Sequence, residues 1–310
     1  MPAPFPIIPE LTAIAIAYRN KALIADLALP RVPVAKEQFS YLLLTKSEGF
    51  TIPDTKVGRK SAPTKVEFTG TKTDSSTVDY GLDSPIPDDD VKNAPPGYDP
   101  VGRSVERLTD LIALDREVRT AALVFAQATY AAANRVALAG TDQWSDFTTG
   151  VSDPIDDIMV GLNACIMRPN VMVIGLAAYT KLVMHPKMIK AVRGTSADAG
   201  IVSRQAVAEL FELEEILVGS GWKNTAKKGQ AITMAQVWGK HCSLVYRDKL
   251  ADTSGGTTFG FTAEFGSRVS GSIPDPNIGL RGGQNVRVGE SVKELVTASD
   301  LGYFIENAVA

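Results

Sequence analysis

The sequence predicts an α+β fold, which contains both helices and strands. Three observations lead to this prediction. Helical spacing of apolar residues runs through 104–140, strand and helix patterns alternate over 169–250, and strand and turn patterns alone follow. At 310 residues with 45% hydrophobic content, the chain can bury a substantial core as one large or two intimate domains.

Charge and cysteine content exclude several classes of protein. The formal net charge is −3 and the pI is about 5.6, so specific nucleic-acid recognition is not expected. The two cysteines, Cys165 and Cys242, build no disulfide framework and indicate a reducing compartment. The amino terminus lacks the features of a signal peptide, and the apolar run 121–140 is too polar for a membrane span. A soluble protein made in the cytoplasm is expected.

Four prolines in residues 1–9 predict an extended arm that a neighbour must order, because proline lacks an N–H donor. A short helix follows and stops before Pro30, and the next strand covers 39–45. The apolar positions of this helix, spaced by three and four, are Leu11, Ile14, Ala15, Tyr18, Ala22 and Ala25.

Residues 45–100 are dominated by Gly, Pro, Asp, Lys, Ser and Thr, and alternation survives only in short pieces such as 65–70 and 76–83. This composition predicts a long polar hairpin that projects from the body. An isolated two-stranded hairpin is only marginally stable in water, so this one is expected to lie on a neighbouring subunit.

A long spine helix is predicted next. Ser104 is its expected cap, Glu106 lies in its first turn and Gly140 ends it, which gives a rod of roughly 50 Å at 1.5 Å per residue. A second helix begins where Ser152 or Asp153 provides a cap and Pro154 takes the first helical position. Its expected buried positions are Ile155, Ile158, Met159, Leu162 and Ile166.

The rest of the chain begins with strand and helix patterns in alternation and ends with strands alone. The pattern predicts a strand at 171–176, a helix at 177–184, a break at Pro186 and a short helix ended by Gly194. A helix around 203–211, a strand at 214–219, a loop and a strand at 238–247 follow. Strands are predicted within 257–266, 286–298 and 301–309, with a bend at Ser299 and Asp300.

The motifs that commonly carry chemistry are absent or incomplete, so no catalytic residue, cofactor or metal is predicted. His185 has no Cys, Asp or Glu at metal-ligand spacing, and His241 and Cys242 point to opposite faces of a strand. The glycine-rich stretches 219–224 and 281–289 do not precede a helix in a phosphate-binding pattern and are interpreted as a loop and a turn. Asp83 and the run 88–90 do not match a calcium loop and predict a solvated acidic loop.

The polar hairpin leaves two interpretations open. It contains a cluster of basic residues that forms either a solvated tip or an electrostatic contact with an adjoining subunit. These residues are Lys56, Arg59, Lys60 and Lys65.

The order of these parts resembles the major capsid proteins of tailed bacteriophages, whose Hong Kong 97-type fold is shared with encapsulins. The segments that carry the resemblance are LIADLALPRVPVAKEQFSY, GFTIPDT, PNVMVIGLAAYTKLVMHPKMIKAVRG, VWGKHCSLVYR and VRVGESVKELVTASDLGYFIENAV. Together they extend along nearly the whole chain.

The resemblance implies a division into named parts. These are an N-arm (1–35), an E-loop with a flanking P-domain strand (36–100), the spine-helix region of a P-domain (101–160), an A-domain (161–250), P-domain β segments (251–298) and a C-terminal segment that returns to the A-domain (299–310).

The resemblance also implies a structural role without enzymatic activity. Copies assemble into pentamers and hexamers of an icosahedral shell that encloses double-stranded DNA, and the protein resides in the virion after assembly in the host cytoplasm. The implied partners are other copies, a scaffolding protein, a portal, a cement or decoration protein and the packaged DNA, with no membrane. A long helical scaffolding segment is missing, which implies a separate scaffolding protein or a processed form.

The residues expected at contacts between subunits are Phe5, Ile7, Phe50, Lys56, Arg59, Lys60 and Lys65. Some relatives join subunits by Lys–Asn isopeptide bonds, but neither Lys60 nor Asn277 matches those positions. Two alternatives remain, an encapsulin-like compartment and a nucleotide- or phosphate-using α/β enzyme built around 171–194.

Overall fold

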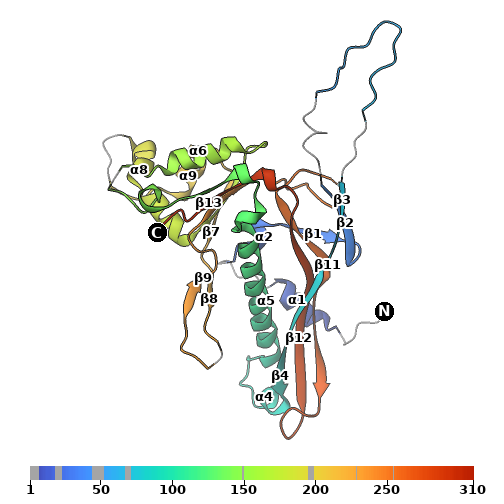
Figure 1. The fold of residues 1–310 in the computed structure, drawn as a ribbon. Coiled ribbons are helices and arrows are strands. Elements are labelled where there is room, and N and C mark those ends of the chain that lie inside the picture. The colour runs from blue at the N-terminus through green and yellow to red at the C-terminus, as the bar shows by residue number, and fades with distance from the viewer. Residues whose placement is uncertain are drawn as a thin grey trace.

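The computed structural model describes residues 7–17, 23–43, 52–66, 71–148, 150–194, 199–227, 229–253 and 255–310. Figure 1 shows two bodies that meet at the upper end of one long helix. One is an elongated sheet with helix α5 beside it, and the other is a five-stranded sheet with helices packed on it. The α+β prediction is confirmed.

The elongated sheet has the strand order β1-β11-β12-β4. Its centre is the antiparallel pair β11 (Gly260–Asp275) and β12 (Gly283–Val296), and β4 (Val78–Pro87) continues the antiparallel pattern on one edge. The short strand β1 (Arg31–Val34) is parallel to β11 on the other edge. The predicted carboxyl-terminal strands are therefore present, and β11 continues to Asp275, well beyond the predicted end at 266.

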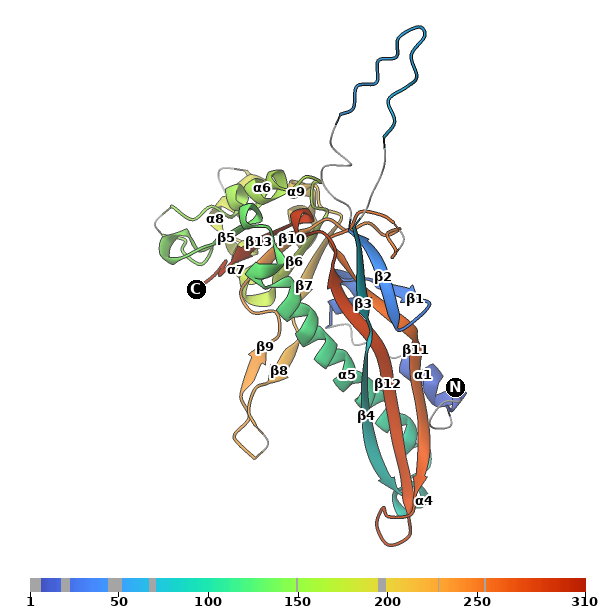
Figure 2. The same cartoon turned by 45° about the vertical axis from the view of Figure 1, so that its right-hand side comes forward.

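Helix α5 (Pro100–Val124) packs against β12 and β4, and α1 (Pro9–Ala17) packs against β11 and α5 (Figure 2). Their apolar faces share one core because side chains spaced by three and four lie on one side of a helix. The buried residues of this core are Leu11, Ala15, Ile86, Val105, Leu108, Ile112, Val286 and Val288.

Both predicted ends of the spine helix are wrong. The cap is Asp99, whose carboxylate accepts hydrogen bonds from Val101 N (3.0 Å) and Gly102 N (2.9 Å), with Pro100 at the first position. The helix ends at Val124, 16 residues before Gly140, and three short 3-10 turns follow. Those turns are η1 (Gln127–Thr129), η2 (Ala132–Asn134) and η3 (Gly140–Asp142).

Tyr130 explains the early end of α5. Its ring stacks on Phe259 and Phe304, and its hydroxyl contacts Ser243 Oγ (2.6 Å) and donates to the carbonyl of Val124 (2.7 Å). A continuing helix would carry this ring away from the second sheet, so burial of an aromatic side chain outweighs the local helical pattern.

The second sheet has the order β5-β13-β10-β6-β7. Its strands are β5 (Arg135–Ala137), β13 (Gly302–Glu306), β10 (Cys242–Val245), β6 (Val171–Gly175) and β7 (Glu215–Gly219). Every residue of β6 is buried, as expected for a strand covered on both faces. Turn η4 (Ser299–Leu301) forms the predicted bend before β13.

The helices of this body are α6 (Pro154–Ala164), α7 (Leu176–Met184), α8 (Pro186–Arg193) and α9 (Arg204–Phe211). Asp153 caps α6 and Gly194 ends α8 with φ of 94°, as predicted. Ile158 and Leu162 of the predicted stripe are buried, whereas Ile166 is exposed. The predicted strand 238–247 shrinks to β10, because Trp238 turns into the core and Gly239 takes a left-handed φ of 58°.

The amino-terminal helix also differs from its prediction. Helix α1 ends at Ala17, and Ala25 begins a separate short helix α2 (Ala25–Ala28). The predicted solvated acidic loop is instead the end of β4 and the first turn of α4 (Asp88–Lys92), where Asp83 pairs with Arg287 and Asp89 with Arg281. Negative charge favours the start of a helix, so three consecutive aspartates suit this turn.

Two hairpins leave the body in opposite directions (Figures 1 and 2). Strands β2 (Gln38–Leu43) and β3 (Thr71–Ser76) form the base of the predicted polar hairpin, from which 52–66 extends. Strands β8 (Trp222–Asn224) and β9 (Met234–Gln236) form a second hairpin, so the prediction of a plain loop after β7 is wrong.

Candidate assembly surfaces and the junction behind them

The loop 52–66 has no core of its own. Every residue in it is exposed, including Ile52, which is 92% exposed, and Val57 and Val66. Its described internal contacts are local, such as the hydrogen bond from Thr64 Oγ1 to the carbonyl of Asp54 (2.9 Å). Apolar side chains on a projection are typical of a surface that another molecule covers.

The predicted basic cluster lies on this loop. Lys56, Arg59, Lys60 and Lys65 are all exposed, against a single acidic residue, Asp54. None of the ion pairs found between described residues includes these four side chains. The loop therefore presents positive charge together with apolar surface.

The structure places the other predicted contact residues as follows. Ile7 forms an isolated antiparallel bridge with Gly271 of β11, and Ile8 N donates to the carbonyl of Ser270 (3.1 Å). The Ile7 side chain is 44% exposed although its backbone is fixed. Phe5 and Phe50 lie outside the described residues.

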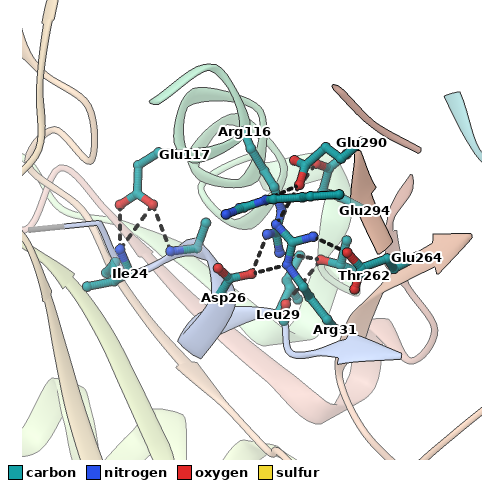
Figure 3. A network of polar contacts seen from close by, with 12 residues as sticks. Ile24, Asp26, Leu29, Arg31, Arg116, Glu117, Thr262, Glu264, Glu290 and Glu294 are labelled. Carbon is teal, nitrogen blue, oxygen red and sulfur yellow. Dashed lines mark hydrogen bonds and ion pairs between the residues drawn. The ribbon is translucent and has the colours of Figure 1, made fainter. Parts of the chain in front are cut away.

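A buried carboxylate joins the two bodies behind these surfaces (Figure 3). Glu117 of α5 is fully buried and accepts hydrogen bonds from Ile24 N (2.9 and 3.0 Å), Ala25 N (2.7 Å) and Trp238 Nε1 (2.5 Å). Burial raises the pKa of Glu117, although these donors oppose the rise. One side chain thus ties the spine helix, the segment before β1 and the second sheet together.

An ion-pair network continues from Glu117 across the elongated sheet. Arg31 of β1 donates to Asp26 (2.7 Å), Glu264 (2.6 Å) and Glu290 (2.9 Å), and the buried Arg116 of α5 also donates to Asp26. Arg268 also pairs with Glu290 (2.9 Å), and Glu294 pairs with Arg119 (3.0 Å) and Arg116 (3.9 Å).

The arginines of this network change the titration of its carboxyls. Burial raises the pKa of Asp26, but Arg116 and Arg31 outweigh that effect and hold it below the ordinary 3.8. Glu290 follows the same pattern, because Arg31 and Arg268 hold its pKa below 4.5 against the effect of burial. Both side chains are therefore charged at neutral pH.

The sequence interpretation missed this junction. The sequence does contain a signal for a buried polar junction. Arg116 and Thr120 continue the series, spaced by four residues, that begins with the buried Leu108 and Ile112. A long cationic side chain on an apolar stripe requires buried acidic partners. The signal for the β8–β9 hairpin is Gly229, a turn-forming residue between two short segments of mixed polarity.

The two histidines serve the fold. His185 is buried and caps α8 through a hydrogen bond from Lys187 N to its Nδ1 (3.2 Å), and burial lowers its pKa. His241 Nδ1 accepts from Asn307 N (2.9 Å). Burial raises the pKa of the Cys165 thiol to about 12, so this thiol stays protonated at neutral pH.

Metal sites and membrane-spanning helices are both absent from the part of the chain that the structure describes. No group of three or more His, Cys, Asp or Glu side chains among the described residues is arranged to hold a metal ion. No helix in the described ranges is both long and apolar enough to cross a membrane.

Comparison with known proteins identifies the class. No protein-family model matches the chain. The major capsid protein of Pseudomonas phage JBD67 is 57% identical over 308 residues, covering 99% of each chain. The major capsid protein of Burkholderia phage BcepMu is 29% identical over 245 residues, covering 77% of this chain and 75% of the relative.

Solved structures agree with these relatives. A phage-related protein from Bordetella bronchiseptica RB50 superposes with a TM-score of 0.74 at 25% identity, covering 97% of each chain. A capsid structure of the cyanophage P-SCSP1u superposes with a TM-score of 0.55 at 12% identity, covering 94% of this chain and 89% of the other.

The fold and the exposed projections thus define a shell-forming subunit with the Hong Kong 97-type fold. More particularly, the chain belongs to the major capsid protein family of tailed phages. The capsid interpretation is better supported than the encapsulin-like alternative.

Proposed function

We propose that this chain builds an icosahedral phage head from pentamers and hexamers around double-stranded DNA, with its N-arm and E-loop lying across neighbouring copies. In this proposal the N-arm is 1–35, the E-loop and its flanking strand are 36–100, and the P-domain combines 101–160 with 251–298. The A-domain is 161–250, joined by the C-terminal segment 299–310.

The observation that carries the proposal is the complete exposure of 52–66. Fully burying an aliphatic side chain stabilises by about 1.5–3 kcal/mol, so covering Ile52, Val57 and Val66 supplies each copy with a few kcal/mol. Many such contacts act together in a closed lattice, and a modest gain at each one is sufficient for a stable shell.

The proposed contact residues have complementary roles. Phe5, Ile7 and Phe50 supply apolar contacts, whereas Lys56, Arg59, Lys60 and Lys65 supply positive charge that selects an acidic neighbouring surface. Exposed ion pairs contribute little individually, so these lysines and arginine set the orientation of the loop more than its affinity.

The other partners follow from the role in the head. A scaffolding protein, a portal and a cement or decoration protein complete the shell, and assembly in the host cytoplasm precedes residence in the virion. Contact with packaged DNA is non-specific, and the mildly negative net charge of −3 avoids the tight phosphate binding of a basic lining. The chain acts structurally, without catalysis.

The test is a deletion that leaves the folded body intact. Replacing 52–66 by a short Gly-Ser linker preserves β2, β3 and β4, whereas a deletion reaching into 78–87 would remove an edge strand of the elongated sheet. The expected product is a folded subunit with a wild-type melting transition that forms no closed shells by negative-stain microscopy. Wild-type-like shells from this variant refute the overlap of neighbouring copies.

A further inference from the structure

The β8–β9 hairpin is a second projection, and the proposed overlap of the E-loop gives it no role. Trp222, Ile232 and Met234 are 50%, 77% and 51% exposed. Trp222 pairs with Gln236 and Asn224 with Met234 in the hairpin register, so Trp222 and Met234 share one face. Two large apolar side chains on one open face predict a partner surface.

The hairpin is built as a defined element. Thr225 N donates to the carbonyl of Thr233 (2.8 Å), Val237 N donates to the carbonyl of Gly221 (2.9 Å), and Asn224 Oδ1 accepts from Thr233 N (3.1 Å). At its base Trp238 is fully buried. The exposed face is therefore held in place before any partner arrives, which reduces the entropy cost of docking.

Charge along the sequence points to the partner. Between Glu215 and Asp248 the chain contains four lysines, two of them Lys223 and Lys227, and no acidic residue. Between Arg135 and Arg168 it contains aspartates at 142, 146, 153, 156 and 157 and no lysine or arginine. One chain thus carries two long stretches of opposite charge.

The aspartates gather in space. Burial raises the pKa of Asp157, and the negative charges of Asp156, Asp153 and Asp142 raise it further, against a hydrogen bond from Trp144. Asp142 and Asp156 are exposed. Lys187 of α8 neutralises Asp153 (2.9 Å), but no ion pair found in the described part of the chain involves Asp142 or Asp156.

The acidic surface also offers apolar contacts. Phe147 and Val151 are 36% and 57% exposed beside the aspartates. Lys181 lies over one face of the Phe147 ring at 5.5 Å. The surface therefore matches the hairpin in kind, because it combines exposed apolar side chains with exposed charge of the opposite sign.

The topology keeps the two surfaces of one copy apart. The acidic stretch follows β5 and the basic hairpin follows β7, and these are the two edge strands of the five-stranded sheet. Four strand spacings of about 4.8 Å place those edges roughly 19 Å apart. Helix α6, which carries Asp156, packs against β10 and β13, and the hairpin leaves the sheet beyond β7, so the two surfaces of one copy lie apart. Such a pair of surfaces joins successive copies head to tail and forms a ring when the rotation between copies closes.

We propose that the β8–β9 hairpin of one copy docks on the acidic surface around Asp142, Phe147, Val151 and Asp156 of the next copy in the same ring. This inference rests on the proposed shell function and adds a contact between the five-stranded sheets of neighbouring copies. It is separate from the overlap of 52–66.

Chemical cross-linking of the wild-type particle tests the pairing directly. A carbodiimide joins an amine to a carboxylate only where they touch. We expect intermolecular peptides linking Lys223 or Lys227 to Asp142 or Asp156, identified by mass spectrometry of mixed light and heavy isotope-labelled subunits. Cross-linked particles that contain other intermolecular links but lack these overturn the proposal.

Charge reversal gives a second readout. The pairs K223E/K227E and D142K/D156K should each lower the fraction of subunits in closed shells at least tenfold, and the combined variant should recover it. The control R103E/R107E reverses two exposed arginines of α5, outside both surfaces and outside the E-loop, and should assemble as wild type. Circular dichroism establishes that each variant is folded.

The outcomes separate this inference from the proposed function. If wild-type shells form and both reversal pairs assemble normally, the head-to-tail contact is wrong and the shell function stands. If the reversals block assembly but the combined variant does not recover, the two surfaces do not meet. If the wild-type chain itself forms no rings or shells, the proposed function fails together with this contact.

Discussion

Glu117 and Trp238 hold the spine helix to the five-stranded sheet through a buried hydrogen bond of 2.5 Å between a carboxylate oxygen and the indole Nε1. The same carboxylate accepts from the backbone of Ile24 and Ala25. Three elements far apart in sequence therefore depend on one acceptor group.

Replacement of Glu117 by alanine should destabilise the unassembled subunit by about 3–5 kcal/mol, because it leaves three buried donors without an acceptor. Glu117→Gln should cost less, since one oxygen is retained. Urea unfolding followed by tryptophan fluorescence measures both. An alanine variant as stable as wild type would show that water replaces the carboxylate.

Acid should weaken the subunit through the ion-pair network. The pKa values of Asp26 and Glu290 lie below 3.8 and 4.5 in the folded chain, so the folded state binds fewer protons there than the unfolded state. Their contribution is complete above the unfolded pKa and is lost as pH falls from about 5 to about 3. In R31M the unfolding free energy should depend less steeply on pH in this window, and equal slopes for the two proteins would contradict the assignment.

Helix α5 offers a matched pair of cap variants. Asp99→Ala should destabilise by about 1 kcal/mol, because Val101 N and Gly102 N lose their acceptor. Ser104→Ala, at the cap position that the sequence predicts, should cost less than Asp99→Ala, since Ser104 lies inside the helix. Thermal melts of the unassembled subunits decide between the two positions, and a larger loss at Ser104 would reverse the conclusion.

Gly219 should tolerate no side chain. A Cβ atom there would lie 2.1 Å from Cγ of Trp238, whose ring is fully buried and cannot retreat. Gly219→Ala should therefore destabilise by at least about 1–3 kcal/mol, the usual cost of overpacking. Gly255→Ala is the control, because nothing lies within 4 Å of its Cβ position. Similar melting temperatures for the two variants would contradict the close approach of Trp238.

The sequence predicted those parts of the fold that depend on local chemistry. The cap at Asp153, the break at Pro186 and the glycine ending at Gly194 are short-range signals, and the structure has each of them. Strand β11 was predicted as a shorter piece, because its paired length depends on contacts with β12 that the local pattern does not show.

Other parts could not be predicted because tertiary contacts decide them. The helical pattern continues past Val124, but the ring of Tyr130 stacks on Phe259, just before β11, and on Phe304 of β13, both distant in sequence. The opposite charges of 136–167 and 216–247 can be read from the sequence, but their separation in space could not be predicted, because it depends on a strand order that places β5 and β7 at opposite edges. The contact residues Phe5 and Phe50 remain predictions.

The elongated sheet is also a lever arm. The 16 residues of β11 span about 50 Å at 3.3 Å each, and the arm is fixed to the rest of the molecule near one end, where Glu117 and Arg116 lie. A tilt of about 5° at that end displaces the far tip by about 4 Å over this length. In the proposed shell, a small angular adjustment at this end would therefore move the far tip by several ångströms, which would let one subunit fold fit different curvatures.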